Sequence, residues 1–143
     1  ALPGHTLDHL AYWVDHTHLF SGDVLFSAGC GRLFEGTPAQ MYASLQTLAR
    51  LPGDTLIYPA HEYTTKNLEF ALTIEPENPA LLQRNLEVRS LRAQGQPSLP
   101  TRLRQELQFN PFLRCQQLTS LPQYQGLTPV ELFAQIRAQR NSF

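Results

Sequence analysis

The sequence contains little cysteine, methionine or tryptophan, with two, one and one respectively among 143 residues. Cys30 and Cys115 lie 85 positions apart, so we expect neither a disulfide framework nor a thiolate zinc motif. No apolar run approaches the ~20 residues that a membrane span requires, and no signal-peptide pattern is found at the N-terminus. We therefore expect a soluble, cytoplasmic protein with no membrane partner.

Charge is also unevenly distributed. Residues 1–77 hold nine acidic against three basic residues, a net −6, whereas residues 78–143 hold three against eight, a net +5. An acidic half suits a cation site and a basic half suits an anionic ligand. The same charges would also be found if the two halves only had solvated surfaces of opposite charge that attract each other. The arginines are spread over several expected elements without interleaved aromatic residues, so nucleic-acid binding is not expected.

The length suits one core, or one small core with a helical appendage. The two prolines of Glu75-Pro76-Glu77-Asn78-Pro79 mark a boundary where the charge balance changes sign. We therefore predict an α/β (α+β) fold with one domain at residues 1–77 and a small all-helical domain at residues 78–143.

Apolar patterns and turn residues predict the elements. Residues 9–14 and 19–26 are expected to be paired strands, and residues 55–59 a short buried strand. Helices are expected over residues 38–51, 62–74, 80–93, 101–107 and 129–140, with Thr37 and Thr128 as N-caps. Residues 110–114 are expected to be extended, and residues 115–127 to be a loop. Tyr12, Trp13 and Phe26 are predicted to lie in the core.

Three potential metal ligands stand where apolar segments meet turns: His5, Asp23 and His61. Two imidazoles and a carboxylate suit zinc, iron or manganese, and one carboxylate can bridge two cations. His16 and His18 are interpreted as part of a polar hairpin turn, and His9 as a strand-end histidine or a residue that supports a ligand.

Several motifs together resemble the hydroxyacylglutathione hydrolase (glyoxalase II) family of the metallo-β-lactamase superfamily. They are Pro-Gly-His-Thr at 3–6, Ser-Gly-Asp at 21–23, Gly-Cys-Gly-Arg-Leu-Phe-Glu-Gly at 29–36, Pro-Ala-His-Glu-Tyr-Thr at 59–64, Glu-Asn-Pro at 77–79, Asn-Pro-Phe-Leu-Arg at 110–114 and Ile-Arg-Ala-Gln-Arg-Asn-Ser-Phe at 136–143. The resemblance covers nearly all of the chain.

The resemblance implies the C-terminal half of an αβ/βα sandwich followed by a helical domain. It implies that His5, Asp23 and His61 are catalytic metal ligands for two divalent cations, zinc first with iron or manganese possible. It also implies hydrolysis of a glutathione thioester, S-D-lactoylglutathione, to glutathione and D-lactate. The glutathione contacts that it implies come from Arg32, Phe34, Tyr63, Arg137 and Arg140, although Phe34 stands where some members carry tyrosine.

One family segment, T-H-x-H-x-D-H with four further metal ligands, is not found in these residues. The chain is therefore interpreted as a C-terminal portion that hydrolyses little alone, with one sheet face exposed unless the missing N-terminal half covers it. Two alternatives remain at this stage. One is a non-catalytic fragment, and the other is a different enzyme of the superfamily, such as a persulfide dioxygenase or a lactonase.

Overall fold

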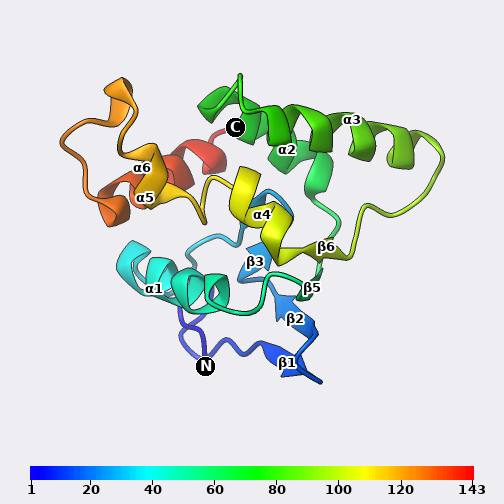
Figure 1. Cartoon of the computed structure of the whole chain (residues 1–143). Coiled ribbons are helices and arrows are strands. Elements are labelled where there is room, and N and C mark those ends of the chain that lie inside the picture. The colour runs from blue at the N-terminus through cyan, green and yellow to red at the C-terminus, as the bar shows by residue number, and fades with distance from the viewer.

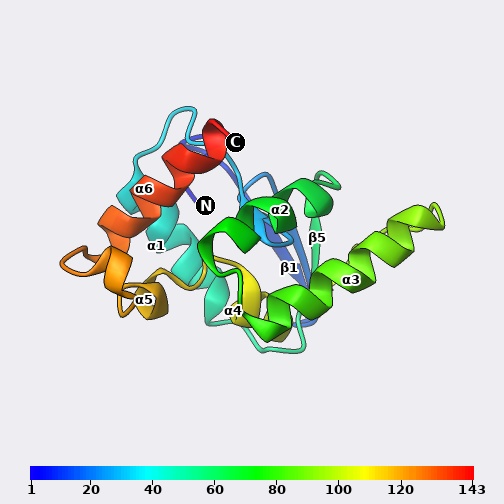
Figure 2. The ribbon, with the colours of Figure 1, turned by 90° about the horizontal axis from the view of Figure 1, so that it is seen from above.

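The computed structural model describes residues 1–143. Figure 1 shows a small sheet and helix α1 (Pro38–Ala49) in the lower part of the molecule, with the other helices above them. Figure 2 shows that α3 (Pro79–Ala93) projects from the rest of the molecule at its C-terminal end. None of the helices is both long and apolar enough to cross a bilayer.

The main sheet has four strands in the order β1-β2-β5-β6. β1 (Tyr12–Val14) pairs with β2 (His18–Gly22) as an antiparallel hairpin, as predicted. β2 runs parallel to β5 (Leu56–Pro59), which in turn pairs antiparallel with β6 (Thr101–Arg102). The parallel pair places the carboxyl ends of β2 and β5 at the same edge of the sheet.

The prediction of one strand over residues 19–26 is wrong. Gly22 has φ +56°, and the pairing register with β5 shifts between Phe20 and Gly22. This turn ends β2 and starts a separate two-stranded hairpin of β3 (Leu25–Phe26) and β4 (Gly29–Cys30). Because of this break, Asp23 lies in a turn and not in a strand.

The helices follow their sequence signals closely. Thr37 and Gln40 form a reciprocal capping box at the start of α1, and α2 (Thr64–Ile74) follows β5. The Asn78 side chain caps α3, and Thr128 caps α6 (Pro129–Asn141). Between them lie α4 (Leu103–Phe109), α5 (Cys115–Leu118) and a 3₁₀ turn, η1 (Pro122–Tyr124).

Three local predictions in the second half are wrong. Thr101 and Arg102, expected to begin a helix, form strand β6, and α4 begins at Leu103. Residues 110–114 form a turn rather than an extended segment, because the Asn110 carbonyl and side chain accept hydrogen bonds from Leu113 and Phe112. The stretch 115–127 is not only loop, since it contains α5 and η1. Their apolar side chains, including Leu118 and Tyr124, are buried in the core.

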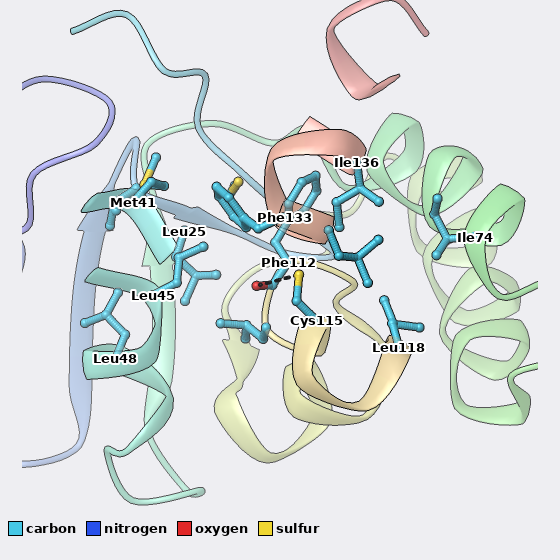
Figure 3. Close-up of a cluster of buried hydrophobic side chains, with 14 of the residues drawn as sticks. Leu25, Met41, Leu45, Leu48, Ile74, Phe112, Cys115, Leu118, Phe133 and Ile136 are labelled. Atoms are coloured by element: carbon cyan, nitrogen blue, oxygen red, sulfur yellow. Dashed lines mark hydrogen bonds between the residues drawn. The ribbon is translucent and has the colours of Figure 1, made fainter. Parts of the chain in front are cut away.

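One hydrophobic core joins both parts of the chain. Figure 3 shows Leu25, Met41, Leu45 and Leu48 on one side of it, Phe112 and Phe133 in the middle, and Ile136 beyond them toward Ile74. A smaller cluster forms where α2, α3 and α4 meet, around Leu68, Leu81 and Phe109. The domain division at residue 77 stays a prediction.

The outer face of the sheet is apolar and exposed. Tyr12, Phe20 and Tyr58 are register partners on β1, β2 and β5, so their side chains share one face. Tyr12 is 63% and Phe20 47% exposed. The prediction that Phe26 is buried is confirmed, but the prediction of core positions for Tyr12 and Trp13 is wrong, because β1 is an edge strand with nothing packed outside it.

Candidate functional site

Asp23 and His61 meet because each follows one of the two parallel strands. The main-chain N–H of Ala60 donates to the carbonyl of Gly22 at 3.0 Å, which continues the pairing of β2 and β5 past the end of the strands. His61 Nε2 then lies 3.2 Å from Asp23 Oδ1. Neighbouring parallel strands thus bring together two side chains that are 38 positions apart in the sequence.

His5 reaches the same carboxylate from the loop that precedes β1. Its Nδ1 lies 2.9 Å from the carbonyl oxygen of Arg32, which can only accept a hydrogen bond, so Nδ1 carries the proton. In the neutral imidazole the lone pair is then on Nε2, which lies 3.9 Å from Asp23 Oδ2. This is the usual arrangement of a metal-binding histidine, whose second nitrogen donates to a main-chain carbonyl.

The loops around Asp23 pack too closely for a side chain at residue 31. A Cβ built on Gly31 would lie 1.8 Å from the Asp23 carbonyl oxygen and 3.2 Å from His5 Nδ1. Glycine at this position therefore allows the main chain after β4 to lie against both His5 and Asp23.

His9 supports the main chain of Asp23. The Asp23 N–H donates to His9 Nε2 at 3.1 Å, which requires that Nε2 is unprotonated. Burial, and next the neighbouring His5, lowers the pKa of His9 and so favours its neutral form. The supporting role considered for His9 therefore takes the form of a hydrogen bond to the main chain of Asp23 rather than to a ligand imidazole.

The three potential ligands fit a bridged pair of cations in type and orientation. His5 faces one oxygen of Asp23 and His61 faces the other, so these three side chains are the ones that would hold such cations, through imidazole nitrogens and carboxylate oxygens. No group of three His, Cys, Asp or Glu side chains is arranged to hold a single metal ion. Any closed coordination sphere would need donors from outside these residues.

A pocket of about 660 Å³ extends from these ligands. Its lining includes all eight site residues that the sequence indicated, together with Phe26, Cys30, Gly31, Lys66, Asn67, Asn141 and Phe143. Four of the lining residues are cationic, Arg32, Lys66, Arg137 and Arg140, against the single carboxylate of Asp23. The pocket therefore combines potential cation ligands with an excess of positive charge.

The two arginines of α6 differ in their surroundings. Arg137 is 5% exposed, donates to the carbonyls of Cys30 and Gly31 and to Asn141 Oδ1, and lies over the Phe112 ring. Arg140 is only partly buried. Neither arginine forms an ion pair with a carboxylate of the chain, and burial and then Arg137 lower the pKa of Arg140.

Aromatic rings flank the potential ligands. Tyr63 stacks on His61 with ring centroids 4.8 Å apart, and Phe26 packs edge-on against Tyr63. Phe34 lies 4.9 Å from the His5 ring and is 67% exposed. Two exposed aromatic faces are thus available to a ligand beside the potential metal ligands.

Two supporting residues were missed from the sequence. Asn67 lies one helical turn after Tyr63, and this spacing is the signal that could have indicated it. Glu106 is fully buried and accepts hydrogen bonds from Ser27 and Ala28 of the β3–β4 turn, as well as from Thr101 and Asn110. Glu106 could have been noticed in the sequence because it is a charged residue on the otherwise apolar face of α4.

Asp8 and Glu62 lie close in sequence to the potential ligand histidines, but their carboxylates accept hydrogen bonds from other groups. Asp8 Oδ1 accepts from the Thr6 hydroxyl at 3.1 Å. Glu62 accepts hydrogen bonds from Thr64 and from the main chain and hydroxyl of Ser98. Burial alone would raise the pKa of Glu62, but these hydrogen bonds outweigh it and lower the pKa. Glu62 therefore joins the start of α2 to the loop before β6.

Comparison with protein families gives a match over residues 62–143 to the family described as hydroxyacylglutathione hydrolase C-terminus. Relatives named hydroxyacylglutathione hydrolase include one from Methylobacillus flagellatus, 55% identical over 99% of this chain and 57% of its own length. Another, from Yersinia enterocolitica, is 50% identical over 100% of this chain and 58% of its own length. A third, from Aeromonas hydrophila, is 65% identical over 81% of this chain and 45% of its own length. The chain spans about half the length of these relatives.

Among solved structures, a crystal structure of a metallo-beta-lactamase from Staphylococcus aureus subsp. aureus COL matches with a TM-score of 0.51 and 21% identity. The match covers 97% of this chain and 37% of that chain. At this identity the likeness concerns the fold alone, and it agrees with the predicted fold class.

Proposed function

The chain belongs to the hydroxyacylglutathione hydrolase C-terminus family, and from this premise we propose that its pocket binds the glutathione part of an S-(2-hydroxyacyl)glutathione thioester for hydrolysis. Water and the thioester would give the thiol of glutathione and a 2-hydroxy acid, which is D-lactate when the substrate is S-D-lactoylglutathione. A cytoplasmic setting and a role in methylglyoxal degradation are part of the same proposal.

One observation carries this proposal. A single pocket is lined both by the three potential metal ligands and by four cationic side chains. A thioester of glutathione has a carbonyl that a metal can polarise and carboxylates that cations can bind. The pocket thus offers complementary chemistry to both parts of such a substrate.

The residues of this chain that would hold two cations are His5, Asp23 and His61. Zinc fits these donor types, and iron or manganese would also fit. When bound, such a pair supplies a nucleophile from water at neutral pH and polarises the thioester carbonyl. The hydrogen bond from His5 to the Arg32 carbonyl and the stacking of Tyr63 on His61 hold the two imidazoles in place.

The glutathione part would be held by the cationic and aromatic lining. Arg140 is partly exposed and free of carboxylate partners, so it is the arginine best placed to meet a substrate carboxylate. Arg137 is buried and bonded to main-chain carbonyls, and would act by fixing the shape of the β4 loop. The rest of the glutathione-binding part of the pocket would be lined by Tyr63, Phe34 and the main chain around Arg32.

Hydrolysis is expected to need ligands beyond those of this chain, because three ligands shared by two cations leave both incomplete. We expect the 143-residue chain with zinc to hydrolyse S-D-lactoylglutathione very slowly. Addition of the N-terminal part of the Methylobacillus flagellatus relative, joined to the chain or supplied separately, should restore hydrolysis.

The test follows thioester loss and thiol release in parallel, with His61→Ala in the same joined protein as the control. Rapid hydrolysis that His61→Ala abolishes would support the proposal. A joined, folded protein that binds zinc but does not release thiol from the thioester would contradict it.

A further inference from the structure

Asn67 joins three separate parts of the pocket wall. It lies on α2 and is 5% exposed. Its Nδ2 donates to the carbonyl of Ser27 at 3.1 Å, in the turn between β3 and β4. Its Oδ1 accepts from Nε and Nη2 of Arg140 on α6, at 3.3 and 3.2 Å. The amide therefore bridges the β3–β4 turn and the last helix.

The orientation of the Asn67 amide is fixed by the chemistry of its neighbours. The Ser27 carbonyl can only accept, so it must face the NH₂ group, and the amide oxygen then faces Arg140. Ser27 is itself held, because its hydroxyl donates to Glu106 at 2.7 Å and the next main-chain N–H donates to the same carboxylate. Arg140 is therefore held by an acceptor that is itself fixed by buried hydrogen bonds.

A neutral acceptor suits an arginine that must remain available to an anion. Burial, and then repulsion by the nearby Arg137 and Arg32, lowers the pKa of Arg140. A carboxylate at residue 67 would pair with the guanidinium and reduce its attraction for a ligand, whereas an amide oxygen orients it with its full charge. Nη1 of Arg140 makes no hydrogen bond within the chain, so it is left for a ligand.

We propose that Asn67 is a positioning residue for anion binding, which aims the guanidinium of Arg140 into the pocket so that it meets a carboxylate of the glutathione part. This inference rests on the proposed function, because it takes glutathione as the ligand. Asn67 acts only through Arg140 and touches no reacting atom.

A double-mutant cycle tests this coupling with glutathione itself as the probe. Binding to the 143-residue chain is measured by calorimetry for the wild type, Asn67→Ala, Arg140→Ala and the double variant. Asn67→Ala should weaken binding by about five-fold in the wild-type background, because residues in contact couple measurably. In the Arg140→Ala background the same change should have almost no effect.

Asn110→Ala is the matched control. Asn110 is also buried and also holds the β3–β4 hairpin, through the carbonyls of Phe26 and Gly29, but it makes no hydrogen bond to Arg140. This control should lower the stability of the hairpin and leave the effect of Arg140→Ala on glutathione affinity unchanged.

A second measurement does not depend on a ligand. The Nε–H signal of Arg140 in ¹H–¹⁵N spectra should be protected from solvent exchange in the wild type and in Asn110→Ala, and should lose that protection in Asn67→Ala. Two results would overturn this inference and leave the proposed function standing. One is that Asn67→Ala weakens glutathione binding equally in both backgrounds, and the other is that the Arg140 Nε–H signal in Asn67→Ala is the same as in the wild type. A wild-type chain that does not bind glutathione would overturn the proposed function, and this inference with it.

Discussion

The main-chain N–H of Asp23 donates to Nε2 of His9 at 3.1 Å, so a histidine that is not a candidate ligand holds the turn that carries the candidate bridging carboxylate. The Asp23 side chain faces His5 and His61. The position of the carboxylate depends on an acceptor 14 residues earlier in the chain.

His9→Phe tests this relationship. Phenylalanine keeps a ring of similar size but offers no acceptor to the Asp23 N–H, so the turn should loosen and zinc affinity should fall about 10-fold. Zinc binding is measured by competition with a chromophoric chelator. His16→Phe, in the exposed turn between β1 and β2, is the control and should bind zinc as the wild type does. Equal zinc affinity in the wild type and His9→Phe would contradict the assigned role.

The two arginines of α6 should respond differently to alanine. Arg140→Ala should weaken glutathione binding about 10-fold with little change in stability, because it removes a charged contact at the surface of the pocket. Arg137→Ala should mainly lower the free energy of unfolding, by about 2–4 kcal/mol, because it leaves buried carbonyls without their donor. Calorimetry with glutathione and urea denaturation separate the two effects.

Arg89→Ala is the control for both arginine variants, since Arg89 is exposed on α3 and lies outside the pocket. It should change neither glutathione affinity nor stability. In the joined enzyme, Arg140→Ala should raise KM for the thioester with kcat less affected. An unchanged KM would exclude Arg140 from substrate binding.

Glu62 should make stability depend on pH in the acid range. Its pKa is lower in the folded chain than in the unfolded chain, so its contribution is present above the unfolded value of about 4.3 and is lost as pH falls through the folded value. Glu62→Gln should cost about 1–2 kcal/mol at pH 7 and much less in strong acid. Urea denaturation at a series of pH values measures this difference, with the exposed Glu69→Gln as a control that should show none.

The exposed aromatic face of the sheet should make the 143-residue chain self-associate and bind the dye ANS. Phe20→Thr removes the central ring of the row formed with Tyr12 and Tyr58, and keeps a residue suited to a strand. It should lower dye fluorescence and the apparent mass in sedimentation. Leu86→Gln, on the exposed side of α3, is the control. A sharp unfolding transition of a monomer that does not bind ANS would contradict this prediction.

Most helices could be predicted from the sequence because their signals are local. Thr37-Pro38 and Thr128-Pro129 begin helices as expected, since a side-chain acceptor followed by proline satisfies a helix start without help from the rest of the fold. The strands were harder to predict. Residues 19–26 read as one apolar strand pattern, yet the register of β2 against β5 shifts before Gly22 and the short β3–β4 hairpin is held by Glu106 and Asn110, far away in the sequence.

The sequence alone determined the types of chemical group in the site, since two imidazoles, one carboxylate and the arginines of the last helix can be read from its motifs. Only the tertiary structure decided how these groups are used. It placed the potential ligands on separate oxygens of Asp23, buried Arg137 against main-chain carbonyls, and oriented Arg140 through Asn67. The reason is physical: residue type fixes which bonds a side chain can make, whereas burial and neighbours far apart in sequence fix which of them it makes.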